Sequence, residues 1–221
     1  MIASSVLTVF AAASLTNVLP AIDHHPRYSF AGSNALAAQI QQGAPADVFA
    51  SANTAIPKQL YEAGLVEKPI VFTRNELILI VPKSNPAHIH SVYDLRRNGI
   101  KLDVAAPGVP VGDYTRTVLH NLDLDAALEN IVSNETDVRE VLAKVALGEA
   151  DAGLVYTTDA RAVRGKVATI GIRWSAQPIV RYAVAVVKSS KHAAAARAYV
   201  KKLLRPGAQR KLLAAGFLKR K

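Results

Sequence analysis

The sequence predicts an α/β protein built from two lobes with mixed sheets, joined by a two-strand hinge. Short apolar segments typical of strands alternate along the chain with segments of helical periodicity. The 221 residues are enough for two lobes. The two longest β-like runs, 77–81 and 182–187, lie far apart in the sequence. If both runs cross between lobes, lobe 1 comprises residues 1–79 and 187–221, lobe 2 comprises residues 80–186, and the hinge lies near 78–83 and 181–187. Alternatively, both runs are buried central strands of one sheet.

The individual elements follow from periodicity and from the residues that end them. The segments predicted as strands are 6–11, 27–31, 48–50, 69–73, 77–82, 101–105, 130–133, 152–156, 167–170 and 181–187. Helices fill the gaps between them. Leu15, Val18, Leu19 and Ile22 form an apolar stripe, and Pro20 should bend that helix.

Three more helices have clear boundaries in the sequence. The helix that includes Leu36 and Ile40 should stop before Gly43, and the helix that begins near Val138 should end at Gly148. A final helix should begin at Pro206 and close at Gly216.

Four of these helix starts directly follow a predicted strand. Ser14 and Ser33 stand at two of them, 107–114 (PGVPVGDY) leads into a helix that begins near 112–113, and 134–137 (NETD) opens the fourth. Backbone NH groups in the first turn of a helix have no intrahelical partner and favour an anion. One serine of this kind is usually an ordinary helix cap. Four starts together, at the carboxyl ends of strands, indicate a site for a small oxyanion.

The bulk composition narrows the class of protein. Hydrophobic residues make up 50% of the chain, and no stretch of about 18 uninterrupted apolar residues is present, so we expect a globular domain without a membrane-spanning segment. The start, residues 1–5, runs straight into a strand, so an export signal is either absent or already removed. The chain has no cysteine, which excludes disulfides and thiolate chemistry.

The formal net charge is +10. Much of this excess lies in the tail from Lys188 to Lys221, where we expect solvated helix faces and a frayed end. Aromatic residues are only 6% of the chain and do not interleave with the basic residues, so we expect no nucleic-acid binding.

Several segments resemble the molybdate-binding proteins of ABC uptake systems, in matching order and over essentially the whole chain. They are TVFAAASLT (8–16), FAGSNALAAQI (30–40), GAPADVFASA (43–52), VPVGDY (109–114), TDVR (136–139), GLVYTTDA (153–160), YAVAVV (182–187) and LRPGAQ (204–209). The resemblance implies a periplasmic-binding-protein fold of type II, a periplasmic or extracytoplasmic location, free or lipid-anchored, and delivery of the ligand to an ABC permease. It also implies a monomer that has no cofactor and is not an enzyme.

The resemblance further implies which residues hold the ligand. Ser14 and Ser33 would each bind the oxyanion through hydroxyl and backbone NH. Val111 and Val138 would each contribute a backbone NH, and Tyr156 its hydroxyl. Many relatives have Ala at the position of Val111, so its branched side chain must point away from the ligand. The metal of molybdate or tungstate would be bound only as the oxyanion.

Two charged residues adjoin these positions. A carboxylate facing a dianion would be repulsive, so we expect Asp137 to be a helix cap turned outward. Arg139 should lie past the first helical turn as a surface residue. The predicted site therefore uses uncharged donors. Hydrogenphosphate carries a proton that needs an acceptor, so a donor-only site should reject it. Sulfate is smaller but has the right charge, and a sulfate-binding protein is the alternative function.

Other classes of function have weaker support. A seryl nucleophile would need a nearby base, but the histidines, His24, His25, His88, His90, His120 and His192, lie outside the predicted site segments, and no Gly-x-Ser-x-Gly motif occurs. We expect the pair His24–His25 to be solvated rather than metal-binding. The segment before Ser14 is too short for a DNA-binding helix-turn-helix, and the site segments lack the Arg and Asp that an amino-acid ligand would require.

Overall fold

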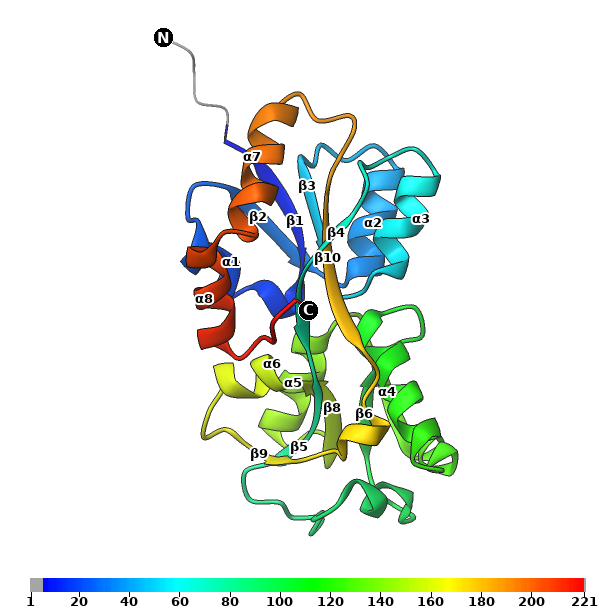
Figure 1. Ribbon diagram of the computed structural model, residues 1–221. Helices are drawn as coiled ribbons and strands as arrows, with labels where there is room; N and C mark the ends of the chain where they lie inside the picture. The colour runs from blue at the N-terminus through cyan, green and yellow to red at the C-terminus, as the bar shows by residue number, and fades with distance from the viewer. Residues whose placement is uncertain (1–5, 221) are drawn as a thin grey trace. The chain divides into compact units, whose positions relative to one another are not determined.

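A computed structural model describes residues 6–220 (Figure 1). The expected approach to the first strand (1–5) and the last tail residue, Lys221, lie outside the described residues. The chain forms two compact units. Unit 1 contains the chain up to Arg74 and from Arg181 onward, and unit 2 contains Asn75–Val180. Among the described residues, no helix combines the length and the apolar character that crossing a bilayer would require.

Unit 1 is a five-stranded sheet in the order β2-β1-β3-β10-β4. Its strands are β1 (Thr8–Ala12), β2 (Arg27–Ala31), β3 (Val48–Ser51), β4 (Ile70–Asn75) and β10 (Val180–Val186). Strand β1 runs parallel to β2 and β3, whereas β10 is antiparallel to β3. The helical segments are η1 (Ala13–Leu15), α1 (Val18–Ile22), α2 (Ser33–Gln41), α3 (Ala55–Glu62), α7 (Ala193–Leu203) and α8 (Pro206–Ala215).

Helices cover both faces of this sheet, with α2 and α3 on one side and α1, α7 and α8 on the other (Figure 1). On the side of α2 and α3, Leu36 and Ile40 of α2 and Leu60 of α3 pack against Phe10 and Phe49 of the sheet. All five side chains are less than a tenth exposed. Because helices cover both faces of the sheet, the residues of β3, and those of β1 after Thr8, are all buried. The core thus fixes where the carboxyl ends of β1 and β2 emerge.

Unit 2 is a second five-stranded sheet in the order β7-β6-β8-β5-β9. Its strands are β5 (Leu77–Pro82), β6 (Leu102–Ala105), β7 (Ile131–Glu135), β8 (Ala152–Tyr156) and β9 (Val167–Ile170). Strand β6 is parallel to β7 and β8, and β5 is antiparallel to β8 and β9. The helical segments are η2 (Val92–Arg96), α4 (Pro110–Asn121), η3 (Asp125–Asn130), α5 (Val138–Leu147), α6 (Thr157–Ala162) and η4 (Trp174–Ala176). Helix α4 lies on one side of the sheet, and α5 and α6 lie on the other (Figure 1).

The structure confirms an α/β fold with two mixed sheets and contains a strand at each predicted strand segment. The unit boundaries differ from the expected ones. The sequence places them at 79/80 and 186/187, whereas the structure divides the chain at 74/75 and 180/181. The reason is strand pairing: β5 pairs with β8 and β9 of unit 2, and β10 pairs with β3 of unit 1.

Two helix predictions also need correction. The stripe from Leu15 to Ile22 is not one bent helix but two short segments, η1 and α1. Pro20 lies in the first turn of α1, where a missing NH breaks no intrahelical bond. It therefore does not bend the helix. Helix α4 begins at Pro110 rather than at 112–113, because proline suits the first helical position.

Candidate functional site

The five predicted ligand residues all lie at the carboxyl ends of parallel strands, two in unit 1 and three in unit 2. In unit 1, Ser14 follows β1 and Ser33 follows β2. These strands are hydrogen-bonded neighbours whose last residues, Ala12 and Ala31, are directly paired. Ser14 and Ser33 each come two residues after that pair, so both lie at the same edge of the sheet. Open α/β sheets bind ligands at this edge.

Ser14 lies inside the 3-10 segment η1, and its side chain is buried. Its Oγ is 2.8 Å from Oη of Tyr182 in β10. Tyr182 is itself fully buried and held by edge-to-face contacts with Phe72 and Phe217. A tyrosine hydroxyl can donate to a serine oxygen, and the serine hydrogen is then available to an acceptor. Tyr182 was missed by the sequence reasoning, although it lies in the matching segment YAVAVV.

Ser33 is the first residue of α2, and only 1% of its surface is exposed. Its Oγ accepts a hydrogen bond of 3.1 Å from the backbone NH of Ala52, just beyond β3. The hydroxyl therefore keeps its hydrogen for donation. The reading of the serines as ordinary helix caps is wrong. The cap positions are Ala12 and Gly32, and neither makes a side-chain cap bond.

In unit 2, Val111 follows β6, Val138 follows β7, and Tyr156 is the last residue of β8. Strand β6 lies between β7 and β8 and is parallel to both. Val111 is the second residue of α4, so its NH belongs to the first turn, where no intrahelical acceptor is available. The residue is only 2% exposed, so its branched side chain is buried. Thr115 donates to the Val111 carbonyl at 2.8 Å and fixes this turn.

The start of α4 approaches the end of β6 very closely. A Cβ atom on Gly112 would lie 2.3 Å from the carbonyl oxygen of Ala106 and 2.4 Å from that of Ala105. Only glycine fits there without a shift of backbone. Arg116 ties the same region together, because its guanidinium donates to the carbonyls of Ala105 (3.0 Å) and Gly112 (2.9 Å). The sequence reasoning missed this cation, which binds backbone carbonyls.

At the start of α5, the structure confirms Asp137 as the helix cap. Its carboxylate accepts from the backbone NH groups of Arg139 (2.6 Å) and Glu140 (3.3 Å). The NH of Val138, the first helical residue, has no intrahelical acceptor because of its position in the helix. Burial raises the pKa of Asp137, and the two NH donors oppose that rise.

Tyr156 is the last residue of β8 and is 1% exposed. Its backbone NH bonds to the carboxylate of Asp159, which is completely buried in α6. The other partner of Asp159 is Arg139, whose Nε lies 2.8 Å from Oδ1. Arg139 is thus in the first turn of α5, with a side chain only 26% exposed, and is not the surface residue that the sequence suggested.

The ion pair of Arg139 and Asp159 links the start of α5 to the end of β8, and therefore Val138 to Tyr156. Burial raises the pKa of Asp159 to about 7, and the charge of Arg139 opposes this rise. The sequence reasoning missed Asp159. The spacing in Tyr156-Thr-Thr-Asp159 is a signal that could have found it, because an acidic residue at the third helical position often bonds back to the cap NH.

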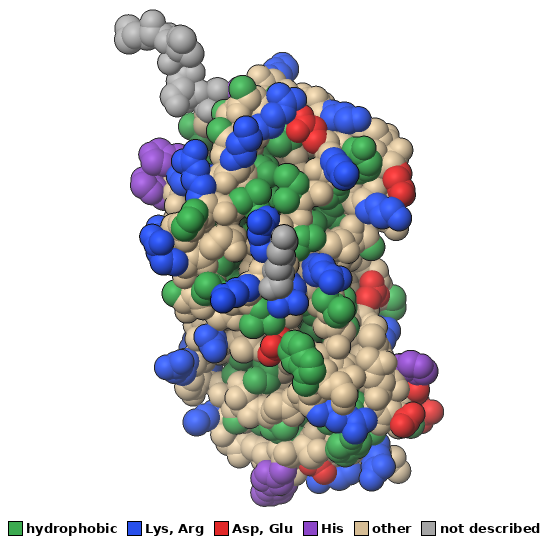
Figure 2. Space-filling view, viewed as in Figure 1, with side chains coloured by type: hydrophobic (Ala, Val, Ile, Leu, Met, Phe, Trp, Pro, Cys, Tyr) green, Lys and Arg blue, Asp and Glu red, His purple; other side chains and the backbone are tan. Residues whose placement is uncertain are grey.

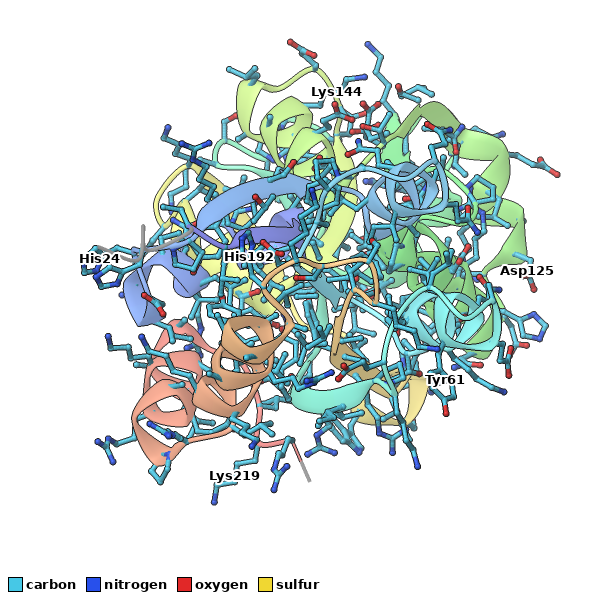
Figure 3. All side chains as sticks on the ribbon, turned by 90° about the horizontal axis from the view of Figure 1, so that it is seen from above. His24, Tyr61, Asp125, Lys144, His192 and Lys219 are labelled. Carbon is cyan, nitrogen blue, oxygen red and sulfur yellow. The ribbon has the colours of Figure 1, made fainter. Side chains whose placement is uncertain are left out.

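Unit 2 also contains an acidic cluster inside its sheet. Asp103 of β6 is fully buried, Glu135 of β7 lies 2.6 Å from Nζ of Lys144, and Lys144 donates to Ser133 at 2.9 Å (Lys144 is labelled in Figure 3). Burial and then the charge of Glu135 raise the pKa of Asp103 to about 7. Lys144 and Ser133 lower the pKa of Glu135 against the effect of burial. The sequence did not indicate this pair.

Four of the six histidines, His24, His25, His120 and His192, contact a carboxylate or one another. His24 and His25 stack on each other at the surface of unit 1, and His25 lies 2.9 Å from Asp23 (Figure 3 labels His24). His192 lies 3.2 Å from Asp47. Over residues 6–220, no group of three or more His, Cys, Asp or Glu side chains is arranged to hold a metal ion.

Known proteins are similar to this chain in sequence and in fold. The family model for bacterial extracellular solute-binding proteins matches residues 7–218. The molybdate-binding protein ModA of Mycobacterium tuberculosis is 39% identical, over 96% of this chain and 84% of the relative. ModA of Haemophilus influenzae is 36% identical, over 97% of this chain and 91% of the relative.

Among solved structures, the periplasmic molybdate-binding protein of Azotobacter vinelandii superposes with a TM-score of 0.84 at 23% identity, over 96% of this chain and 98% of that one, which shows a shared fold. The identities to the ModA proteins, over nearly the whole chain, show kinship as well as fold. The chain therefore belongs to the family of bacterial extracellular solute-binding proteins that includes the molybdate-binding ModA proteins.

Proposed function

We propose that this protein captures molybdate or tungstate outside the cytoplasm and delivers it to the permease of an ABC transporter. The observation that carries the proposal is the placement of all five ligand residues at the carboxyl ends of parallel strands in a chain 39% identical to a molybdate-binding protein. The proposed ligands are the hydroxyl and NH of Ser14 and Ser33, the NH groups of Val111 and Val138, and the hydroxyl of Tyr156.

The proposed donors are divided between the two units. Unit 1 supplies Ser14 and Ser33, and unit 2 supplies Val111, Val138 and Tyr156.

The energetics of neutral donors support tight binding. A hydrogen bond to a charged group contributes about 1.5–3 kcal/mol, so about seven donors contribute roughly 10–20 kcal/mol before costs. Submicromolar affinity needs a net value somewhat above about 8 kcal/mol. The difference is available to offset desolvation of the anion.

The charged side chains near these donors are already engaged. Arg139 pairs with Asp159, Arg116 binds backbone carbonyls, and the Asp137 carboxylate faces two backbone NH groups. This supports a site that selects a fully deprotonated tetrahedral dianion, because a protonated oxyanion would need an acceptor. Sulfate has the same charge as molybdate and is the alternative ligand. Only the smaller size of sulfate can distinguish it from molybdate in such a site. Molybdate and tungstate are nearly equal in size, so we expect both to bind.

Isothermal titration calorimetry with molybdate, tungstate, sulfate and phosphate tests the proposal. We expect saturable heat at one site per chain with molybdate and tungstate, and none with phosphate. Binding of sulfate alone would establish the alternative function. No heat with any of the four anions would overturn the assignment to oxyanion transport.

A further inference from the structure

The entire positive excess of this protein lies in its last 34 residues. Residues 188–221 contain eleven Lys and Arg and no Asp or Glu, whereas residues 1–187 contain sixteen basic and seventeen acidic residues. The chain without this segment would be close to neutral. A charge distribution this uneven is typical of a surface that contacts a polyanion.

The fold gathers these charges on one part of unit 1. Helices α7 and α8, which the segment forms, contact each other, and α8 also contacts α1. Figure 2 shows Lys and Arg side chains spread over the region where Figure 1 draws α7 and α8. We call this region the α7–α8 face and define it by Lys201, Lys202, Arg205, Arg210 and Lys211, all of which are exposed or half-buried.

A groove runs along this face. It has a volume of about 610 Å³ and is lined by Lys202, Arg205, Arg210 and Lys211, with Ile22 and Ala208 among its apolar contacts. The exposed Leu213 lies on the same helix as Arg210 and Lys211. The groove thus combines cations with an apolar lining.

Two of these cations contact acceptors within the protein, and one of those acceptors is a carboxylate. Lys202 lies 2.6 Å from Asp23, and Lys211 donates to the carbonyl of Ala21 at 2.6 Å. Within the part of the chain that the structure describes, no carboxylate forms an ion pair with Lys201, Arg205 or Arg210. Three exposed cations of this face therefore remain available to an external anion.

We propose that the α7–α8 face binds the surface of a bilayer that contains acidic phospholipids, with lipid phosphate groups in the groove. A bilayer presents negative charge over a broad area and requires no detailed match, which suits a groove whose charged lining residues are all cations. The exposed leucine and the apolar groove lining suit lipid, whereas a single-stranded nucleic acid would need exposed aromatic side chains for stacking. Both aromatic residues of 188–220, Tyr199 and Phe217, are buried.

Vesicle co-sedimentation of the full chain tests this inference. One set of vesicles contains phosphatidylcholine only, and the other contains phosphatidylcholine mixed with phosphatidylglycerol. The test variant is Lys201→Gln/Arg205→Gln/Arg210→Gln. The control variant, Lys83→Gln/Arg96→Gln/Arg164→Gln, removes the same net charge from exposed positions of unit 2.

We expect the unmodified protein to sediment with the anionic vesicles only, and less so at high salt. The test variant should lose about tenfold to a hundredfold in apparent affinity, and the control variant about twofold or less. Equal losses in the two variants would show that total charge alone attracts the protein. Equal binding to both vesicle types, or binding to duplex DNA but not to anionic vesicles, would also overturn the proposal. Molybdate titration of both variants checks that they fold, and its outcome does not bear on the membrane surface.

Discussion

Replacing the Ser33 hydroxyl by hydrogen should separate the structural role of this side chain from its proposed role in binding. The Oγ atom is buried and accepts the Ala52 NH at 3.1 Å, and in the proposed site its hydrogen is donated to the anion. Ser33→Ala removes one hydrogen bond to a charged group, worth about 1.5–3 kcal/mol. The dissociation constant for molybdate should therefore rise by about tenfold to about 150-fold. The same change leaves the Ala52 NH without this acceptor and should lower the free energy of unfolding by about 1–3 kcal/mol.

Calorimetric titration measures the first effect, and urea unfolding without ligand measures the second. Two controls separate the site from its surroundings. Ser29→Ala makes the same substitution four residues earlier, inside β2, and His25→Ala alters the exposed histidine pair. Both should bind molybdate as the unmodified protein does. If Ser33→Ala loses stability but keeps its affinity, then Ser33 only supports the β3–α3 connection, and the assignment of the site is wrong. Loss of binding in His25→Ala would refute it equally.

Three further changes test other parts of unit 2. Asp159→Asn leaves the half-buried Arg139 without its carboxylate and should lower the free energy of unfolding by about 1–3 kcal/mol in urea; addition of Arg139→Gln should cost less than the sum of the single changes. Gly112→Ala should displace the start of α4 and weaken molybdate binding in a titration, whereas Gly207→Ala, where a Cβ meets nothing within 4 Å, should leave binding unchanged. Asp103 is protonated in the folded state up to about pH 7 but in the unfolded chain only below its ordinary value of 3.8, so its contribution to stability is lost as pH rises between these values. Urea midpoints from pH 5 to 8 should therefore fall less in Asp103→Asn, and an equal fall in both proteins would contradict the raised pKa.

The strands and the helix ends could be predicted from the sequence because each depends on residues that are close together in the chain. Apolar runs bounded by Gly, Pro and Asn marked the strands, and Gly148 and Gly216 adopt the left-handed conformation that ends α5 and α8. The positions of Ser14 and Ser33 relative to their strands were also local information. The unit boundaries were less accurate, because the assignment of β5 and β10 depends on which distant strands they pair with.

The supporting contacts of the candidate site could not be read from the sequence for the same reason. Arg139 looked like a surface residue because its partner, Asp159, is twenty residues further along the chain and on another helix. Tyr182 reaches Ser14 across 168 positions. Such pairs depend on packing, which periodicity does not encode. The ligand residues themselves were proposed from the resemblance to a known family, whereas the residues that hold them in place became visible only in three dimensions.

The position of β10 has a consequence for how the protein is made. This strand lies between β3 and β4 in the sheet of unit 1, yet it is translated after all of unit 2. Unit 2 is one continuous stretch and can begin to fold as it leaves the ribosome, but β4 has to wait for β10 before the first sheet can close. Strands β3 and β4 therefore lack their common neighbour β10 during synthesis of more than a hundred residues, and in this interval the incomplete sheet is open to misfolding and aggregation.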